Sequence, residues 1–457
     1  MSINPLNQNA MFQKLIRMSL LNILSLCFLL LYPFIAQAQE KTNRPKIALV
    51  LSGGGAKGFA HIGVLKVLEK EGIPIDLIVG TSMGGLVGGI YSLGYTASEL
   101  ETLVKSLDWE TTLSDDVPRA FLSKNDQQLK QRYIFSLPIN GNKKVSLPQG
   151  FIKGQNVINI FCGLAGNVPV EADFSKFPIP FACVAIDLET GKEVVLKNGF
   201  LPTAMFSSMA IPIAFQSSDY DGRFLADGGM VNNFPTDIAK QMGADIIIGV
   251  DIRNDFFDRE NLQSLDNVVN QLIGFFDLTK KSINDSLCDL IIRPDITGYS
   301  MTSFTNGAAD SLIVRGEKAT LKIKSQIREL TAKYQLDAPE KSRKLVKPDK
   351  WHITDLTFTG NYHLAVDFLG TTLNLKIPGY YSSEEIKTAI DRLYGLGGFD
   401  RIYYNLIDTE KGKSLNLNIT TKKEYTFEKS YKKTRPTGRK KYFLKKASNN
   451  LAKANLR

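Results

Sequence analysis

Residues 46–85 read KIALVLSGGGAKGFAHIGVLKVLEKEGIPIDLIVGTSMGG. This stretch contains a short apolar run that ends in glycines, then a helical pattern of apolar residues, then a second apolar run that ends at another glycine. Such alternation is typical of buried parallel strands joined by helices. Further strand-like runs follow at 180–187, 223–226 and 245–251. The sequence therefore predicts an α/β domain with a mainly parallel central sheet over residues 45–335, closed by a helix at 310–334.

The second apolar run leads into Gly80-Thr81-Ser82-Met83-Gly84, which fits the pattern G-x-S-x-G. A strand is expected before Ser82 and a helix after it, and this context is that of a nucleophile elbow. The flanking glycines Gly80 and Gly84 permit the tight turn that presents a serine hydroxyl at the edge of the sheet. The alternative is a simple strand-to-helix turn in which the serine caps the helix.

The glycine-rich loop Gly53–Gly58 lies between the first expected strand and the first expected helix. A dinucleotide site would need an acidic residue after the second strand, and a phosphate-binding P-loop would need Ser or Thr after Lys57. Neither residue is in place, because Gly58 follows Lys57 and the second strand ends in Gly80. The loop is instead typical of an oxyanion hole made from backbone N–H groups. Lys57 is expected to hold this loop or to add positive charge, with an exposed lysine as the alternative.

A serine nucleophile needs a base, and the chain has three histidines: His61, His352 and His363. Two of them fall in the C-terminal part of the chain, and His61 is expected to be a core or supporting residue rather than the base. Asp227 is the better candidate because an apolar strand delivers it into a glycine turn, Asp227-Gly228-Gly229. A dehydrated pocket would raise its pKa enough for it to accept the serine proton. A plain turn is the alternative for this triplet.

These three motifs, in this order, resemble the patatin-like phospholipase family. The resemblance extends through residues 59–65 and 229–235 and covers about 46–251. It implies a three-layer α/β fold and a Ser–Asp dyad that releases fatty acids from phospholipids or other acyl esters, with no metal and no cofactor. By this resemblance Ser82 is the nucleophile and Asp227 the base. The residues assigned to the oxyanion hole and its motif are Gly53, Gly54, Gly55, Lys57, Gly58 and Met83.

A smaller α+β unit is expected at 351–421, after a Lys- and Pro-rich linker at 336–350. Apolar and polar residues alternate at 353–358, 402–406 and 415–419, which predicts three strands. A turn is expected at Gly360-Asn361, and a capping box at Ser382 predicts the start of a helix. The unit resembles a POTRA repeat, as found after a patatin domain and before an outer-membrane β-barrel in one class of autotransporters. Only 37 residues follow from Thr421 onward, so we expect that the barrel was lost or that the chain is truncated.

Charge and targeting signals concern the two ends of the chain. The net charge is +10, but residues 421–457 alone carry thirteen Lys or Arg against two Glu, so the basic character belongs to this tail (422–457), which is expected to be disordered. Residues 1–38 read as a signal peptide with small residues at Ala36 and Ala38, which predicts an exported protein, periplasmic, outer-membrane-associated or secreted. An uncleaved anchor is the alternative. Cys162, Cys183 and Cys288 form no disulfide framework and no metal-binding spacing.

The sequence predicts a lipid acyl hydrolase that acts on phospholipids or other acyl esters at a membrane surface, with no nucleic-acid partner. Two other readings stay open. One is an envelope interaction protein with a vestigial patatin domain, whose POTRA-like unit binds an outer-membrane or other protein by strand addition. The other is an esterase that uses the same dyad on soluble esters. Residues 114–150 are a candidate lid.

Overall fold

The computed structural model describes residues 44–122, 127, 150–334, 348–422, 425–428 and 443–446. The predicted signal peptide lies outside these residues, as do most of the candidate lid and most of the linker. The central sheet has eight strands. Its order is β12 (Leu290–Ile292), β11 (Ile246–Val250), β1 (Ile47–Leu51), β2 (Leu77–Thr81), β5 (Phe181–Asp187), β10 (Arg223–Asp227) and β9 (Ser218–Tyr220), and β6 (Glu193–Leu196) also pairs with β5.

The prediction of a mostly parallel sheet is confirmed. The five strands from β12 to β5 run parallel to their neighbours, whereas β10, β9 and β6 pair antiparallel at one side. Two small strand pairs complete the region: β3 (Gly150–Ile152) with β8 (Ile213–Phe215), and β4 (Ala172–Asp173) with β7 (Asn198–Gly199).

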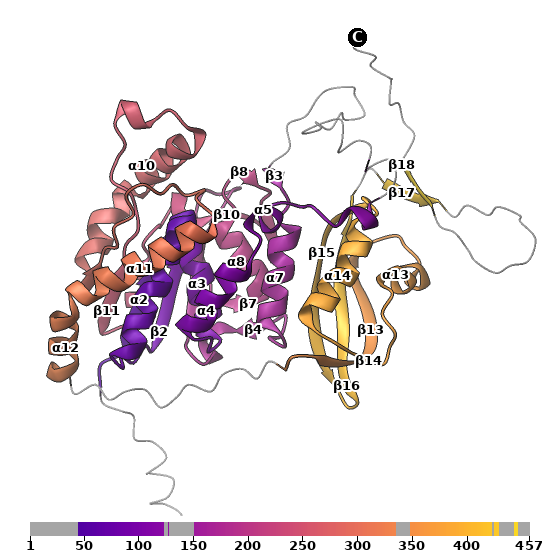
Figure 1. Ribbon diagram of the computed structural model, residues 1–457, viewed down its shortest axis with the longest axis horizontal. Coiled ribbons are helices and arrows are strands. Elements are labelled where there is room, and N and C mark those ends of the chain that lie inside the picture. The colour runs from indigo at the N-terminus through magenta and orange to yellow at the C-terminus, as the bar shows by residue number, and fades with distance from the viewer. Residues whose placement is uncertain are drawn as a thin grey trace, which may run out of the picture. The chain divides into compact units, whose positions relative to one another are not determined.

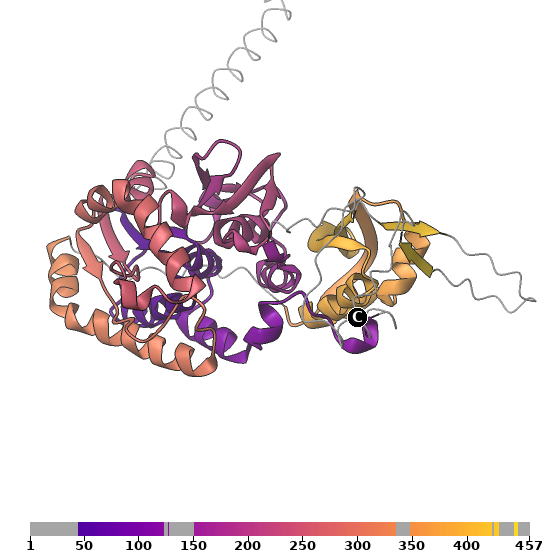
Figure 2. The same ribbon diagram turned by 90° about the horizontal axis from the view of Figure 1, so that it is seen from above.

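Helices connect these strands and cover both faces of the sheet (Figure 1 and Figure 2). They are α2 (Phe59–Lys70), α3 (Met83–Ser92), α4 (Ala97–Ser106), α5 (Trp109–Thr112), α7 (Gln155–Ala165), α8 (Leu201–Met209), α9 (Thr236–Gln241), α10 (Leu265–Ser286), α11 (Asn306–Lys322) and α12 (Lys324–Lys333). The helix expected at 310–334 is thus two helices, because α11 ends at Lys322 and a new helix begins at Lys324.

The alternation of side chains along β1 explains why the sheet is covered on both faces. Ile47, Leu49 and Leu51 point into one buried cluster, which includes α2, α3 and α11. Ala48 and Val50 point into a second buried cluster, which includes α9. Because successive side chains of a strand point to opposite faces, a fully apolar strand such as this one requires cover on both sides.

The C-terminal unit consists of β13 (Trp351–Asn361), α13 (Val366–Leu373), β14 (Gly379–Tyr381), α14 (Ser383–Tyr394), β15 (Phe399–Thr409) and β16 (Gly412–Thr421). Its sheet has the order β14-β13-β16-β15. The capping box at Ser382 is confirmed, since Ser382 and Glu385 exchange side-chain and backbone hydrogen bonds. The turn expected at Gly360-Asn361 is wrong: both residues extend β13, because they pair in parallel with β16.

Residues beyond 421 differ from the expected disordered tail in one respect. They contain an antiparallel pair of short strands, β17 (Tyr425–Glu428) and β18 (Phe443–Lys446). Tyr425, Thr426 and Phe427 of β17 are residue types that favour strands, and the basic composition of the tail conceals this short pattern. In the described ranges, no helix combines the length and the apolar composition needed to cross a bilayer.

Candidate active site

Ser82 lies in the sharp turn between β2 and α3. Its backbone has φ 52° and ψ −125°, a conformation that a residue with a side chain rarely adopts. Holding a residue there costs on the order of 1–3 kcal/mol, and such strain is concentrated at functional sites. Gly80 and Gly84 permit the turn: a Cβ on Gly80 would lie 2.4 Å from the Gly84 backbone, and a Cβ on Gly84 would lie 2.2 Å from the carbonyl oxygen of Leu51. The G-x-S-x-G motif therefore forms the elbow that the sequence predicts.

Strand register brings Asp227 to the same level of the sheet as Ser82. Thr81, the last residue of β2, pairs with Val184 of β5. The next residue of β5, Ala185, pairs with Asp227, the last residue of β10. Although β10 runs antiparallel to β5, it ends where β2 ends, so the two motifs meet across one intervening strand.

The Ser82 hydroxyl donates a hydrogen bond to Asp227, with 2.6 Å between Oγ and Oδ2. The other carboxylate oxygen, Oδ1, accepts the N–H of Gly229 at 2.7 Å. Both side chains are almost fully buried, with Ser82 6% and Asp227 2% exposed. The glycine turn after Asp227 thus orients the carboxylate, and one oxygen remains directed at the serine. This geometry is that of a nucleophile with an adjacent base.

Burial raises the pKa of Asp227 to about 6, against the opposing effects of the hydrogen bonds from Ser82 and Gly229. The base works only as the carboxylate, so we expect hydrolysis to fall as the pH drops through about 6 and to reach a plateau above it. The measurement is kcat/KM against pH on a soluble ester. A profile without a change between pH 5 and 7 would contradict this role, since an unperturbed Asp titrates near pH 4.

The glycine loop passes directly over the nucleophile. A Cβ on Gly53 would lie 3.0 Å from the Ser82 Cβ, and a Cβ on Gly58 would lie 2.0 Å from the Met83 side chain. The N–H of Gly53 donates to the carbonyl of Asn233, so this amide is already used. In the described part of the chain, the N–H groups of Gly54 and Gly55 have no acceptor. These two amides, with the N–H of Met83 at the start of α3, are the donors available to an oxyanion.

Residues 49–240 match the sequence model of the family described as "Patatin-like phospholipase". The chain contains a patatin-like phospholipase domain. An uncharacterized NTE family protein of Mycobacterium tuberculosis is 31% identical over 211 residues, which are 46% of this chain and 50% of that protein. The human patatin-like phospholipase domain-containing protein 6 is 32% identical over 213 residues, 45% of this chain and 13% of that protein. The chain thus spans half or less of the length of these curated relatives.

The likeness to solved structures is weaker. The crystal structure of VipD from Legionella pneumophila is 16% identical, with a TM-score of 0.37 over 62% of this chain and 67% of that one.

Lys57 of the patatin-like domain is fully buried, so the alternative of an exposed lysine is wrong. Its Nζ donates to Asn254 Oδ1 at 2.9 Å, and a Cβ on Gly54 would lie 3.3 Å from its side chain. Burial lowers the pKa of Lys57 to about 8, and nearby Asp251 opposes this shift. Lys57 therefore ties the glycine loop to the segment after β11 and places a buried amino group beneath it.

His61 is not a partner of Ser82. It is completely buried in α2, and its Nε2 donates to the carbonyl of Ser52 at 2.9 Å. Burial lowers the pKa of His61 to about 4, so the ring is neutral at physiological pH. Its Nδ1 has no hydrogen-bond partner among the described residues. The reading of His61 as a supporting residue of the loop agrees with these contacts.

Two groups that position the site carry no recognisable sequence motif. Ser208, on α8, accepts the N–H of Ser82 at 3.0 Å and donates to the carbonyl of Val184 at 2.6 Å, so it fixes the elbow to β5. Asp277, on α10, accepts the N–H of Asn233 at 3.0 Å and pairs with Arg253 at 2.9 Å. Both contacts join residues far apart in sequence, which explains why sequence patterns do not reveal them.

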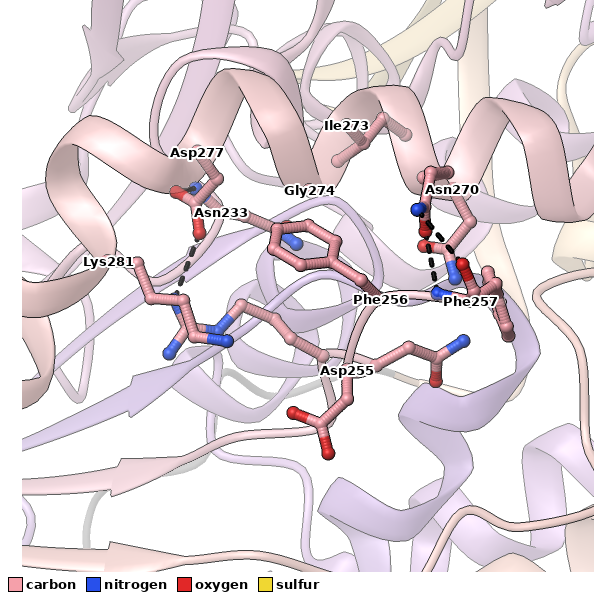
Figure 3. A pocket seen from close by; sticks show the side chains of 12 residues that line it. Asn233, Asp255, Phe256, Phe257, Asn270, Ile273, Gly274, Asp277 and Lys281 are labelled. Carbon is pink, nitrogen blue, oxygen red and sulfur yellow. Dashed lines mark hydrogen bonds and ion pairs between the residues drawn. The ribbon is translucent and has the colours of Figure 1, made fainter. Parts of the chain in front are cut away.

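The contact between Asp277 and Asn233 lies at the wall of a polar pocket, with about 400 Å³ of empty volume, between α10 and the segment 253–257 (Figure 3). Arg253 is the centre of this wall: it pairs with Asp251, Asp277 and Asp285, and its guanidinium lies over the Phe234 ring. Because Asn233 in turn accepts the Gly53 N–H through its carbonyl, this buried ion-pair cluster supports the glycine loop.

Proposed function

We propose that the chain is a serine lipid acyl hydrolase that releases fatty acids from phospholipids or related acyl esters. The observation that carries the proposal is the 2.6 Å hydrogen bond between Ser82 Oγ and Asp227 Oδ2 in a strained elbow. The patatin-like phospholipase match over residues 49–240 supports the same class of reaction.

The proposed reaction has two halves. The Ser82 oxygen attacks the ester carbonyl carbon while its proton moves to the Asp227 carboxylate, and the carbonyl oxygen becomes an oxyanion held by the N–H groups of Gly54, Gly55 and Met83. When the C–O bond breaks, the leaving alcohol takes the proton from Asp227, and the acyl group stays on Ser82. Water then attacks this acyl ester, gives its proton to Asp227, and the fatty acid leaves as the serine recovers its proton.

An apolar pocket supports an acyl chain as the substrate group. It has about 690 Å³ of empty volume, partly open to solvent, and lies between α2, α3, α4, α5 and α7. Met83, the residue after the nucleophile, and Met209, at the end of α8, both line it. Trp109 and Phe304, whose rings lie 5.2 Å apart, line the pocket as well. A lining of apolar and aromatic side chains next to the reacting serine suits a hydrocarbon chain.

Filling this pocket should change which chains are cleaved. Ile160 of α7 lines it and is partly exposed, so Ile160→Trp adds bulk without removing a buried core side chain. We expect hydrolysis of long-chain esters to fall roughly tenfold or more, while short-chain esters are cleaved nearly as before, because pocket fit contributes to kcat/KM chiefly for the long chains. The measurement is kcat/KM over a series of acyl lengths. Val314→Trp, an exposed position on α11, is the matched control, and an unchanged series for Ile160→Trp would contradict an acyl pocket here.

The experiment that tests the substrate class compares a diacyl phospholipid in mixed micelles with a soluble short-chain ester of the same acyl linkage. The proposal expects free fatty acid from the phospholipid. Cleavage of the soluble ester alone would favour a soluble-ester esterase instead. No cleavage of either, together with no covalent labelling by a fluorophosphonate, would favour an interaction protein with a vestigial domain.

We further propose that the unit 351–421 is POTRA-like and that the chain is exported. The order β13-α13-β14-α14-β15-β16 supports the first part, since two helices lie between the first strand and the final strand pair. In its sheet β14 is an outer strand, where a partner strand can add by backbone hydrogen bonds. The targeting signal at 1–38 supports export to the periplasm, the outer membrane or the medium.

A further inference from the structure

The helix α10 exposes a row of apolar side chains to solvent and buries polar side chains against the protein, whereas an ordinary surface helix does the reverse. Its exposed apolar side chains are 38–59% accessible, and their spacing of four, three, one, two and five residues places them within one half of the helix circumference. These residues are Val268, Leu272, Phe275, Phe276, Leu278 and Ile283. The opposite face carries Asp277 and Asn284, which are buried and hydrogen-bonded to Asn233 and Asn232. A stripe of this kind on an outer face marks an interaction surface.

The segment after β11 adds a further aromatic ring to this stripe. Phe256 is 48% exposed, and its ring centroid lies 5.1 Å from that of Phe275. It lies across Gly274, where a Cβ would come within 3.0 Å of the ring, as the close-up of the polar pocket shows (Figure 3). The loop and the helix therefore present one continuous apolar surface.

A second apolar patch lies on the strand pair β3–β8. Phe151 is 62% and Ile213 is 52% exposed. Ile213 has φ 75°, a left-handed conformation that is costly for a β-branched residue. The strain holds an isoleucine outward at a position where glycine would be relaxed. The carbonyl of Ala210, three residues earlier, accepts a hydrogen bond from the N–H of Asp227 at 3.0 Å. The segment that carries Ile213 is therefore bonded to the backbone of the proposed base.

Both patches border the active site. On α10, Ile273 would lie 3.4 Å from a Cβ on Gly229, and Asp277 holds the backbone of Asn233. Figure 1 shows α10 and the pair β3–β8 at the same end of the sheet. We name the two patches together the apolar rim: Val268, Leu272, Phe275, Phe276, Leu278 and Ile283 of α10, with Phe256, Phe151 and Ile213.

We infer that the apolar rim docks the enzyme on a lipid surface. This inference rests on the proposed function, because a lipid ester must travel from a membrane to Ser82, which is only 6% exposed. A lipid layer against both patches presents the ester that the enzyme cleaves, whereas a protein partner on the same surface supplies no substrate. A helix whose apolar face sinks a few ångströms into the acyl boundary gains free energy from each side chain that leaves water.

A tryptophan reporter tests where the surface lies. Phe276→Trp, made in the full chain with Ser82→Ala, places an indole on the rim, and Leu321→Trp places one on the outer face of α11. With phosphatidylcholine vesicles brominated on the acyl chains, we expect bromine to quench the Phe276→Trp chain about twofold more than the Leu321→Trp chain. Trp109 and Trp351 contribute the same background to both. Equal quenching of the two reporters, or quenching of neither, would overturn the inference.

A pair of substitutions tests the driving force. Leu272→Ser with Phe276→Ser should lower vesicle partitioning roughly tenfold or more, because two large apolar side chains leave the interface. Val314→Ser with Leu321→Ser removes side chains of similar exposure on α11 and should leave partitioning unchanged. Equal partitioning of both variants would overturn the inference. So would a dimer in analytical ultracentrifugation that dissociates in the Leu272→Ser, Phe276→Ser variant, because the rim would then bind a second copy of the chain. Every vesicle experiment uses the inactive Ser82→Ala background, so its result depends on membrane binding alone. The proposed function is tested separately, by fluorophosphonate labelling of Ser82 in the unsubstituted chain, and a failure to label would count against that function.

Discussion

Ser82→Ala should reduce fatty-acid release by at least about 10⁴-fold, with little change in folding stability. The substitution removes the attacking oxygen, and no other hydroxyl within the described residues donates to Asp227. Alanine keeps the Cβ at the elbow, so the backbone at φ 52° is no more strained than before. The measurement is release of a labelled fatty acid, with thermal unfolding recorded on the same preparation.

Ser92→Ala is the matched control, because Ser92 is also a buried serine of α3 and donates only to the carbonyl of Gly89. We expect this variant to lose on the order of 1 kcal/mol of folding free energy and to keep its activity. If Ser82→Ala retained a substantial part of the activity while Ser92→Ala behaved as expected, Ser82 would not be the nucleophile.

Asp227→Asn should lower kcat by about 10³- to 10⁴-fold. Asparagine has the shape of aspartate and keeps an acceptor for the Gly229 N–H, but it cannot take the serine proton. It also removes a buried carboxylate whose raised pKa reflects the cost of its charge, so the variant should fold at least as stably as the parent at pH 7. The residual activity should no longer depend on pH near 6.

Asp187→Asn is the control for this substitution. Asp187 ends β5, is 9% exposed, and pairs through its backbone with Leu225 of β10, yet it has no contact with Ser82. Its variant should keep both the rate and the pH dependence of the unsubstituted chain. A rate for Asp227→Asn close to that of Asp187→Asn would mean that another group takes the proton.

The motifs and their order could be predicted from the sequence because each is a local pattern. G-x-S-x-G needs only a strand, a turn and a helix that are contiguous in the chain, and the same holds for the glycine loop. Their convergence depends on register: Thr81 lies level with Val184, and Asp227 with Ala185. Sequence patterns alone do not determine this alignment, because β10 pairs antiparallel in a mostly parallel sheet.

The residues that escaped prediction act over long range. Ser208 and Asp277 each hold a backbone N–H of the site from another helix, and neither belongs to a motif. Lys57 looked equally suited to an exposed position, because its burial depends on Asn254 and on the segment after β11. The helix α10 was not among the elements predicted from the sequence, and the outward direction of its apolar face depends on which polar residues reach the core.

The most direct test of the central claim is the site and pH dependence of covalent labelling by a soluble fluorophosphonate, read by mass spectrometry of peptides from the full chain. We expect one adduct, on Ser82, whose rate of formation falls as the pH drops through about 6 and is nearly lost in Asp227→Asn. An adduct on another residue, or labelling of Ser82 at an undiminished rate in Asp227→Asn, would contradict the dyad.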